Sequence, residues 1–228
     1  DVVTPPAVSS DGSVFVSCKN DTFYAFNPDL TIRWKKYLDL SWDAGNGNSH
    51  PALSNDENTV YIFDNFEGRI NAFNVMNGNL LWKSEEFIKN YGSGALTIAD
   101  NGDILLVHGD IICVKSDGNT RWRKNNAQFH FWGAFSNDGQ KIYAGSYGRL
   151  YIIDALSGGD FYLEFHPLWS PYPNVVDQSG NIYGARGGML RKLNSSSNQV
   201  EWTYVYNGDA ERLALDNASE RVYLAIDD

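Results

Sequence analysis

The chain has 228 residues, of which 18 are Lys or Arg and 28 are Asp or Glu, so its formal net charge is −10. This excess of acidic side chains repels a phosphate backbone and argues against a nucleic-acid partner. No apolar run approaches the ~20 residues that a membrane-spanning helix needs. Aromatic residues make up 14% of the sequence, which suits β-strands that are packed on both faces.

One sequence repeat recurs along the chain and usually ends with a tryptophan. Trp82 and Trp122 are 40 residues apart, Trp202 lies 80 residues further on, and Trp34 stands one longer step upstream. A period near 40 residues with several short strands in each period is typical of a β-propeller. We therefore predict an all-β fold, a β-propeller of four-stranded antiparallel blades, as a single domain over residues 1–228.

The first unit shows how four strands fit into one period. Residues 6–9 and 14–17 are predicted to form strands A and B, joined by an Asp-Gly turn that tolerates positive φ. Residues 22–26 and 31–34 are predicted to form strands C and D. The same parsing places the blades at 5–37, 50–87, 91–125, 131–165 and 170–206, with part of a sixth at 211–228. In the fourth blade, Tyr162 or Phe165 is expected to replace the tryptophan.

The sixth unit contains only two predicted strands, at 212–215 and 221–226. About five and a half blades do not close a ring, because an open propeller leaves a sheet edge and a blade face uncovered. We expect the native protein to continue to seven or eight blades. The alternative is intermolecular completion of the open blade by another chain or segment.

The cysteines and the sequons give expectations about chemical modification. Cys18 and Cys113 fall in the first and third units, too far apart for a disulfide, so we expect two unpaired, buried thiols. Three N-x-S/T sequons, at Asn20, Asn194 and Asn217, lie in predicted turns. They are candidate N-glycosylation sites if the protein is secreted by a eukaryote.

The repeat resembles the PQQ-type propeller repeat, in which Asp-Gly precedes strand B, Ala-Phe-Asn ends strand C, and Gly precedes the closing tryptophan. Residues 23–27 with Trp34, and 70–74 with Gly78 and Trp82, match this pattern best. That family contains quinoprotein alcohol dehydrogenases and a non-catalytic branch, the outer-membrane assembly lipoproteins of bacteria. The resemblance implies an extracellular or periplasmic location. It also implies structural tryptophans that dock their flat faces on neighbouring blades, namely Trp34, Trp82, Trp122 and Trp202.

The sequence offers little support for catalysis. Quinoprotein dehydrogenases hold their quinone against a disulfide between adjacent cysteines and bind calcium through Glu, Asn and Asp, whereas this chain has no adjacent cysteines. We predict no cofactor, with PQQ and calcium as the alternative. We also predict no metal site, because no pair of histidines has ligand spacing, and no Ser-His-Asp or Cys-His nucleophile can be assembled.

Because strand direction alternates, the D–A and B–C connections are expected on one face of the propeller, opposite the A–B and C–D turns. The D–A loops, at 38–50, 84–94, 125–133, 166–172 and 207–210, contain all tryptophans outside the repeat and most histidines. Binding residues collect on loops that a rigid frame holds in place. The candidate binding residues are Trp42, His50, His108, His130, Trp132, His166 and Trp169. Packing between blades is an equally good explanation for them.

We therefore expect a non-catalytic binding or assembly scaffold that engages a protein or a glycan through its D–A loop face. The alternative is a fragment of a PQQ-dependent dehydrogenase, or of another propeller enzyme, whose catalytic residues lie partly outside this chain.

Overall fold

The computed structural model is all-β, and the residues that it describes form no helix. The described residues are 5–18, 21–38, 50–64, 66–87, 95–129, 133–136, 139–146, 149–164, 175–177, 179–186, 188–194, 197, 199–216 and 221–227. None of these segments is a helix that could span a membrane. The chain divides into two compact units, residues 1–125 and residues 126–228.

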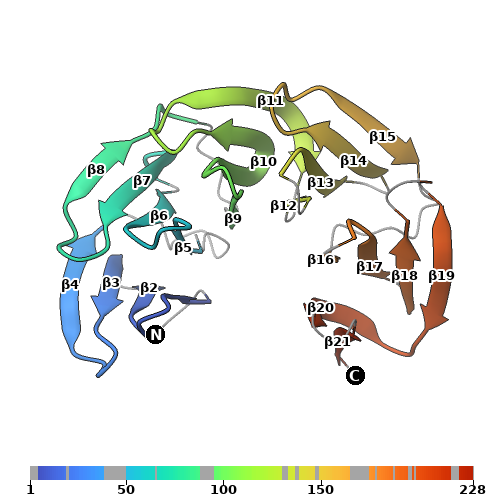
Figure 1. The fold of residues 1–228 in the computed structure, drawn as a ribbon, viewed down its shortest axis with the longest axis horizontal. Coiled ribbons are helices and arrows are strands. Elements are labelled where there is room, and N and C mark those ends of the chain that lie inside the picture. The colour runs from blue at the N-terminus through green and yellow to red at the C-terminus, as the bar shows by residue number, and fades with distance from the viewer. Residues whose placement is uncertain are drawn as a thin grey trace. The chain divides into compact units, whose positions relative to one another are not determined.

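The first unit begins with two four-stranded antiparallel sheets (Figure 1). In the first sheet, the order β1-β2-β3-β4 covers Ala7–Val8, Val14–Cys18, Thr22–Phe26 and Ile32–Tyr37. In the second sheet, the order β5-β6-β7-β8 covers Ala52–Leu53, Thr59–Asp64, Arg69–Asn74 and Leu80–Lys83. Consecutive strands pair throughout, so the predicted order of strands A to D is confirmed in both blades.

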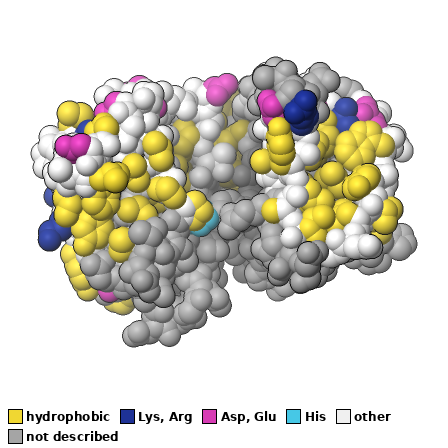
Figure 2. Space-filling model, turned by 90° about the horizontal axis from the view of Figure 1, so that it is seen from below, with side chains coloured by type: hydrophobic (Ala, Val, Ile, Leu, Met, Phe, Trp, Pro, Cys, Tyr) yellow, Lys and Arg dark blue, Asp and Glu magenta, His cyan; other side chains and the backbone are white. Residues whose placement is uncertain are grey.

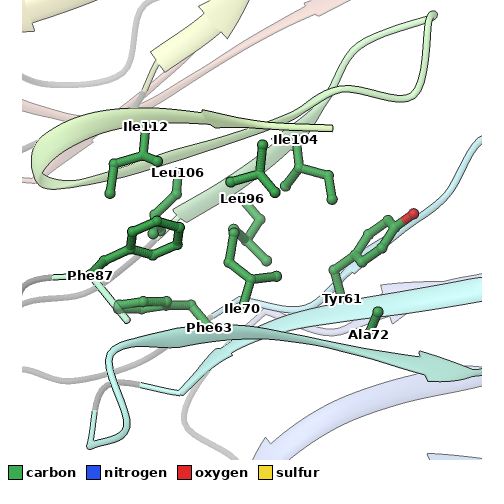
Figure 3. Close-up of a cluster of buried hydrophobic side chains, with 10 residues drawn as sticks. Tyr61, Phe63, Ile70, Ala72, Phe87, Leu96, Ile104, Leu106 and Ile112 are labelled. Atoms are coloured by element: carbon green, nitrogen blue, oxygen red, sulfur yellow. The ribbon is translucent and has the colours of Figure 1, made fainter. Parts of the chain in front are cut away.

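The third sheet has the order β11-β10-β9, over Thr120–Phe129, Ile104–Val114 and Ala95–Ile98. Residues 104–107 of β10 pair with β9. The chain then reverses direction at Gly109, which has a φ of 73°, a value that glycine adopts without strain. Figure 3 shows this reversal between Leu106 and Ile112. Strand β10 thus follows the path of strands B and C in the other blades.

Strand β11 is longer than predicted, because it runs to Phe129 whereas we expected a D–A loop from residue 125. The polar run at 123–128 has no alternation of apolar residues, so its sequence pattern does not distinguish a strand from a loop.

Apolar side chains fill the space between neighbouring sheets of the first unit. One cluster joins the first and second sheets through Phe15, Phe23 and Trp34 on one side and Ile62 and Phe73 on the other. A second cluster joins the second and third sheets, and Figure 3 shows its side chains reaching toward one another from β6, β7, β9 and β10. The alternation of each strand therefore sends one set of residues to each neighbouring sheet.

The second unit holds two four-stranded sheets and a two-stranded one. The order β12-β13-β14-β15 covers Gly133–Phe135, Lys141–Ser146, Arg149–Asp154 and Asp160–Glu164. The order β16-β17-β18-β19 covers Val175–Val176, Ile182–Arg186, Met189–Leu193 and Val200–Val205. The last pair is β20, Asp209–Asp216, with β21, Arg221–Asp227. Tyr143 and Ile152 pack against Ile182 and Leu193 between the two larger sheets.

A shift in strand register accompanies the repeat tryptophan in three blades. The shift follows the pairs Ala25–Trp34, Ala72–Trp82 and Lys192–Trp202. The fourth blade has a regular ladder, in which Phe161 pairs with Ile152 at the position equivalent to that of Trp82. The extra residue of the bulge is thus absent from β15. The expectation that Tyr162 or Phe165 replaces the tryptophan stays a prediction, because Phe165 lies outside the described residues.

Candidate functional site

Each sheet has two ends with different connections. We call the end with the A–B and C–D turns the turn end, and the end with the B–C turn and the D–A connection the loop end. Antiparallel pairing of consecutive strands places the connections in this way in every four-stranded sheet.

The turn end joins neighbouring sheets through tryptophan. The indole Nε1 of Trp34 donates a 2.8 Å hydrogen bond to the Val75 carbonyl in the C–D turn of the next sheet. A Cβ added to Gly78 in that turn would lie 2.7 Å from the Trp34 ring. Trp82 repeats this arrangement, with a 3.0 Å hydrogen bond to Ser116 and its ring beside Gly118. The C–D glycines therefore provide the flat surface on which the indoles lie.

Polar contacts join the A–B turns as well. The Glu57 carboxylate accepts 3.0 Å hydrogen bonds from the Ser10 N–H and a 2.6 Å bond from the Ser10 hydroxyl. The Asn55 amide donates to the carbonyls of Ala99 and Asp100. Because these bonds connect the first sheet with the second and the second with the third, turns that look bland in the sequence hold the blades together.

The loop end has a repeated anchor at the base of its D–A connections. The backbone N–H of Leu38, which follows β4, donates to the carbonyl of Asp21 in the B–C turn at 2.8 Å. Phe87 and Gly68 form the same bond in the second blade, and Tyr206 and Gly188 form it in the fifth. Leu38, Phe87 and Tyr206 are all buried, and their acceptors all have positive φ. Each of these D–A connections is thus fixed at its start to the neighbouring B–C turn.

In the third blade, an ion pair holds the B–C turn. Arg123 of β11 donates to the buried Asp110 carboxylate at 2.9 Å, and its guanidinium lies 5.9 Å from the centre of the Phe87 ring. The second and third blades therefore meet at the loop end through a cation stacked on an aromatic ring.

A buried carboxyl lies at the end of β6, next to the B–C turn of the second blade. Asp64 is almost fully buried and accepts a 2.9 Å hydrogen bond from the Glu67 N–H. Burial raises the pKa of this carboxyl, and the nearby negative charge of Glu67 raises it further. The group stabilises the turn, but its charged form is costly in this position.

Exposed aromatic rings lie at the loop end of the first unit. Phe66, in the B–C turn of the second blade, is 53% exposed, and Tyr37, at the end of β4, is 72% exposed. Sequence reasoning missed these two residues and also the anchors. The anchors could have been found from the apolar residue that follows the repeat tryptophan by four or five positions, at Leu38, Phe87 and Tyr206.

Most of the predicted binding residues lie outside the described residues, namely Trp42, His130, Trp132, His166 and Trp169. His50 is half-buried just before β5, and His108 belongs to β10 next to the reversal at Gly109. Their assignment to a binding surface therefore stays a prediction.

The other two repeat tryptophans differ in exposure. Trp122 is half-buried in β11, and Trp202 in β19 is 39% exposed. Of the sequons, Asn20 and Asn217 lie outside the described residues. The Asn194 side-chain amide donates a 2.6 Å hydrogen bond to Glu201.

Both cysteines are free thiols, as predicted. Cys113 is buried, whereas Cys18 is only half-buried, so the expectation of burial holds for Cys113 alone. Cys18 and Cys113 stand on β2 and β10, in different sheets. In the part of the chain that the structure describes, no three His, Cys, Asp or Glu side chains are grouped as metal ligands would be.

Antiparallel four-strand blades that dock an indole on the C–D turn of the next blade define a β-propeller built from PQQ-type repeats. The comparisons with known proteins agree with this class. The family model for the outer membrane protein assembly factor BamB matches residues 1–161. The chain belongs to this family.

A solved structure supports the fold. The crystal structure of BamB from Moraxella catarrhalis superimposes with a TM-score of 0.73 at 17% sequence identity. The match covers 96% of this chain and 68% of that one. No curated protein matches the chain.

Proposed function

We propose that the protein is a non-catalytic scaffold of outer-membrane protein assembly that binds a protein partner in the periplasm through its loop end. The family model is that of an outer membrane protein assembly factor, which supports both a role in outer-membrane protein assembly and a periplasmic location. The observation that carries the choice of surface is the pair of exposed rings, Tyr37 and Phe66, beside connections whose bases are fixed.

The chemistry of the loop end suits protein recognition. Aromatic side chains are enriched at protein interfaces, because they cover a large area and lose little conformational entropy on binding. The anchors at Leu38 and Phe87 hold the loop bases in place before binding, which lowers the entropic cost of association. The tryptophans and histidines predicted in the D–A loops would extend this surface, namely Trp42, His50, His130, Trp132, His166 and Trp169.

The proposed function requires no cofactor. Cys18 and Cys113 stand in separate sheets, which does not fit the adjacent cysteines of the quinoprotein enzymes. The test is an absorbance spectrum of the purified protein after addition of PQQ and calcium. A bound quinone would contradict the proposal.

Capture from detergent-solubilised outer membranes, with identification by mass spectrometry, tests the surface. Wild-type protein is expected to retain a component of outer-membrane protein assembly, and Phe66→Ala is expected to weaken its retention at least threefold. Met76→Ala is the matched control, because Met76 is equally apolar and exposed but belongs to a C–D turn at the turn end. Equal loss in both variants, or no loss with Phe66→Ala, contradicts the assignment.

A further inference from the structure

The interface between the first and second sheets becomes polar toward the loop end. Ser17 of β2 faces the second sheet, because it lies two positions after Phe15, which belongs to the apolar cluster between these sheets. Asn71 of β7 faces the first sheet, because it pairs with Ile62 of the same cluster. Figure 2 shows the first sheet at the left, from the side opposite to the second sheet, so this interface lies behind the hydrophobic side chains that are visible there.

Both polar side chains are buried at this interface, since Ser17 is 1% exposed and Asn71 is 0% exposed. They lie close together, because Phe23, the cross-strand neighbour of Ser17, is in ring contact with Phe73, two positions from Asn71. Asp64 is also buried and faces the first sheet, since it follows Ile62 by two positions on β6. Hydrogen-bonding groups from both sheets therefore meet here.

The side-chain amide of Asn71 lacks a hydrogen-bond partner among the described residues, both at its nitrogen and at its oxygen. A buried amide that gives up water on folding is costly when no other group replaces that water. Buried polar groups that the protein itself does not pair are commonly paired by ordered water. The Asn71 amide therefore points to a bound ligand that both donates and accepts hydrogen bonds.

The interface between the second and third sheets is apolar at the equivalent positions. Phe63 corresponds to Ser17, because each lies two positions beyond the residue that pairs with the alanine opposite the repeat tryptophan. Ile112 corresponds to Asn71, because each lies three positions after a B–C turn glycine with positive φ. Figure 3 shows Phe63 and Ile112 in one apolar cluster, so a polar interface is not a requirement of the fold.

The first interface also has less side-chain volume at this level than the second. Ser17 and the buried Leu38 each stand where the second interface has a phenylalanine. Phe23 is larger than its counterpart, Ile70, and offsets a part of this difference. A site that is polar and has room for a small molecule suits water.

We propose that Ser17, Asp64 and Asn71 form a buried hydration site between the first and second blades, whose ligand is water. The water accepts a hydrogen bond from the amide nitrogen of Asn71 and donates to its amide oxygen or to the Asp64 carboxyl, and the Ser17 hydroxyl binds it from the first sheet. Water thus bridges two blades where apolar contact joins the next pair. The site lies at the base of the loop end but does not depend on a protein partner.

A crystal structure of the protein tests the site directly. We expect an ordered water within about 2.7–3.2 Å of both the nitrogen and the oxygen of the Asn71 amide, or one water at each atom, with a further contact to Ser17 or Asp64. In solution, nuclear Overhauser contacts should connect water with the Asn71 side-chain N–H groups. An amide without water, or one that bonds to another protein group, overturns the proposal.

Asn71→Leu distinguishes a hydrated amide from an unpaired one, because leucine has the branched shape of asparagine but forms no hydrogen bond. If water fills the site, the variant removes the bridge to Ser17 and Asp64, and the midpoint of thermal unfolding falls by about 3 °C or more. A higher midpoint would show that the amide is unpaired and would overturn the proposal. Asn125→Leu, at an exposed position of β11, is the control and should shift the midpoint by less than about 2 °C. If Asn71→Leu does not fold, the two measurements on the wild-type protein decide.

Discussion

The indole N–H of Trp34 donates its hydrogen bond to the carbonyl of Val75, which belongs to the next sheet 41 residues further along the chain. The bond satisfies the polar atom of a buried ring, and the ring itself closes the apolar cluster between the two sheets. A contact between sheets thus depends on a turn that has no large side chain at Gly78.

Gly78→Ala is expected to lower the free energy of unfolding by about 2–4 kcal/mol, because the new Cβ collides with the Trp34 ring and also takes a positive φ. Gly139→Ala is the matched control, since Gly139 has φ 65° and a Cβ added there would meet no atom of the described residues within 4 Å. It is expected to cost only the ~1–2 kcal/mol of the backbone conformation. Urea denaturation followed by tryptophan fluorescence measures both, and equal losses would show that the ring contact contributes nothing.

Replacement of Leu30 by glycine is expected to stabilise the protein. It has φ 65°, it is 70% exposed, and its turn matches in length the turn that contains Gly118. Leu30→Gly removes a strained conformation and loses no buried contact, so we expect a gain of about 1 kcal/mol in unfolding free energy. The midpoint of thermal unfolding checks this, and a lower midpoint would mean that Leu30 makes a stabilising contact.

The sequence repeat was sufficient to predict the blades, because Asp-Gly turns and alternating strands are local signals. The first and last residues of β2, β3 and β4 lie within a few residues of the predicted bounds. The bulge opposite Trp34 and the regular ladder at Phe161 could not be predicted, since they depend on how the fourth strand pairs and not on its composition.

The loop end was harder to predict than the blades. The tryptophans and histidines of the sequence indicate a binding surface in the D–A loops. Phe66 instead lies in a short B–C turn, where the sequence does not distinguish it from a core residue. The anchor between Phe87 and Gly68 joins backbone atoms that are distant along the chain, and such a contact leaves only a weak trace in a single sequence.

Replacing the buried carboxyl of Asp64 is expected to stabilise the protein at neutral pH. Burial raises the folded-state pKa above the unfolded value of about 3.9, so the folded protein binds more protons in between and loses stability as pH rises through that window. Asp64→Asn keeps an acceptor for the Glu67 N–H and removes the charge. Its advantage in urea denaturation should be about 1 kcal/mol at pH 7 and should shrink at pH 4. An advantage that grows in acid would contradict the direction of the shift.

The Cys113 thiol is expected to be inert in the folded protein. Burial, with the negative charge of Asp103, raises its pKa to about 12, so almost none of it is thiolate at pH 8. In a Cys18→Ala variant, a disulfide reagent should label Cys113 only at the rate at which the protein unfolds. Complete labelling within minutes in native buffer would show that β10 opens locally.

Site-specific photo-crosslinking is the most direct test of the loop end as the partner-binding surface. A photoreactive phenylalanine derivative is placed singly at Tyr37, Phe66, Leu30 and Met76, four exposed positions of which the first two lie at the loop end and the last two at the turn end. The proposed function predicts crosslinks to an outer-membrane assembly protein in the periplasm from positions 37 and 66 and none from 30 and 76. Crosslinks from positions 30 and 76 alone would contradict it.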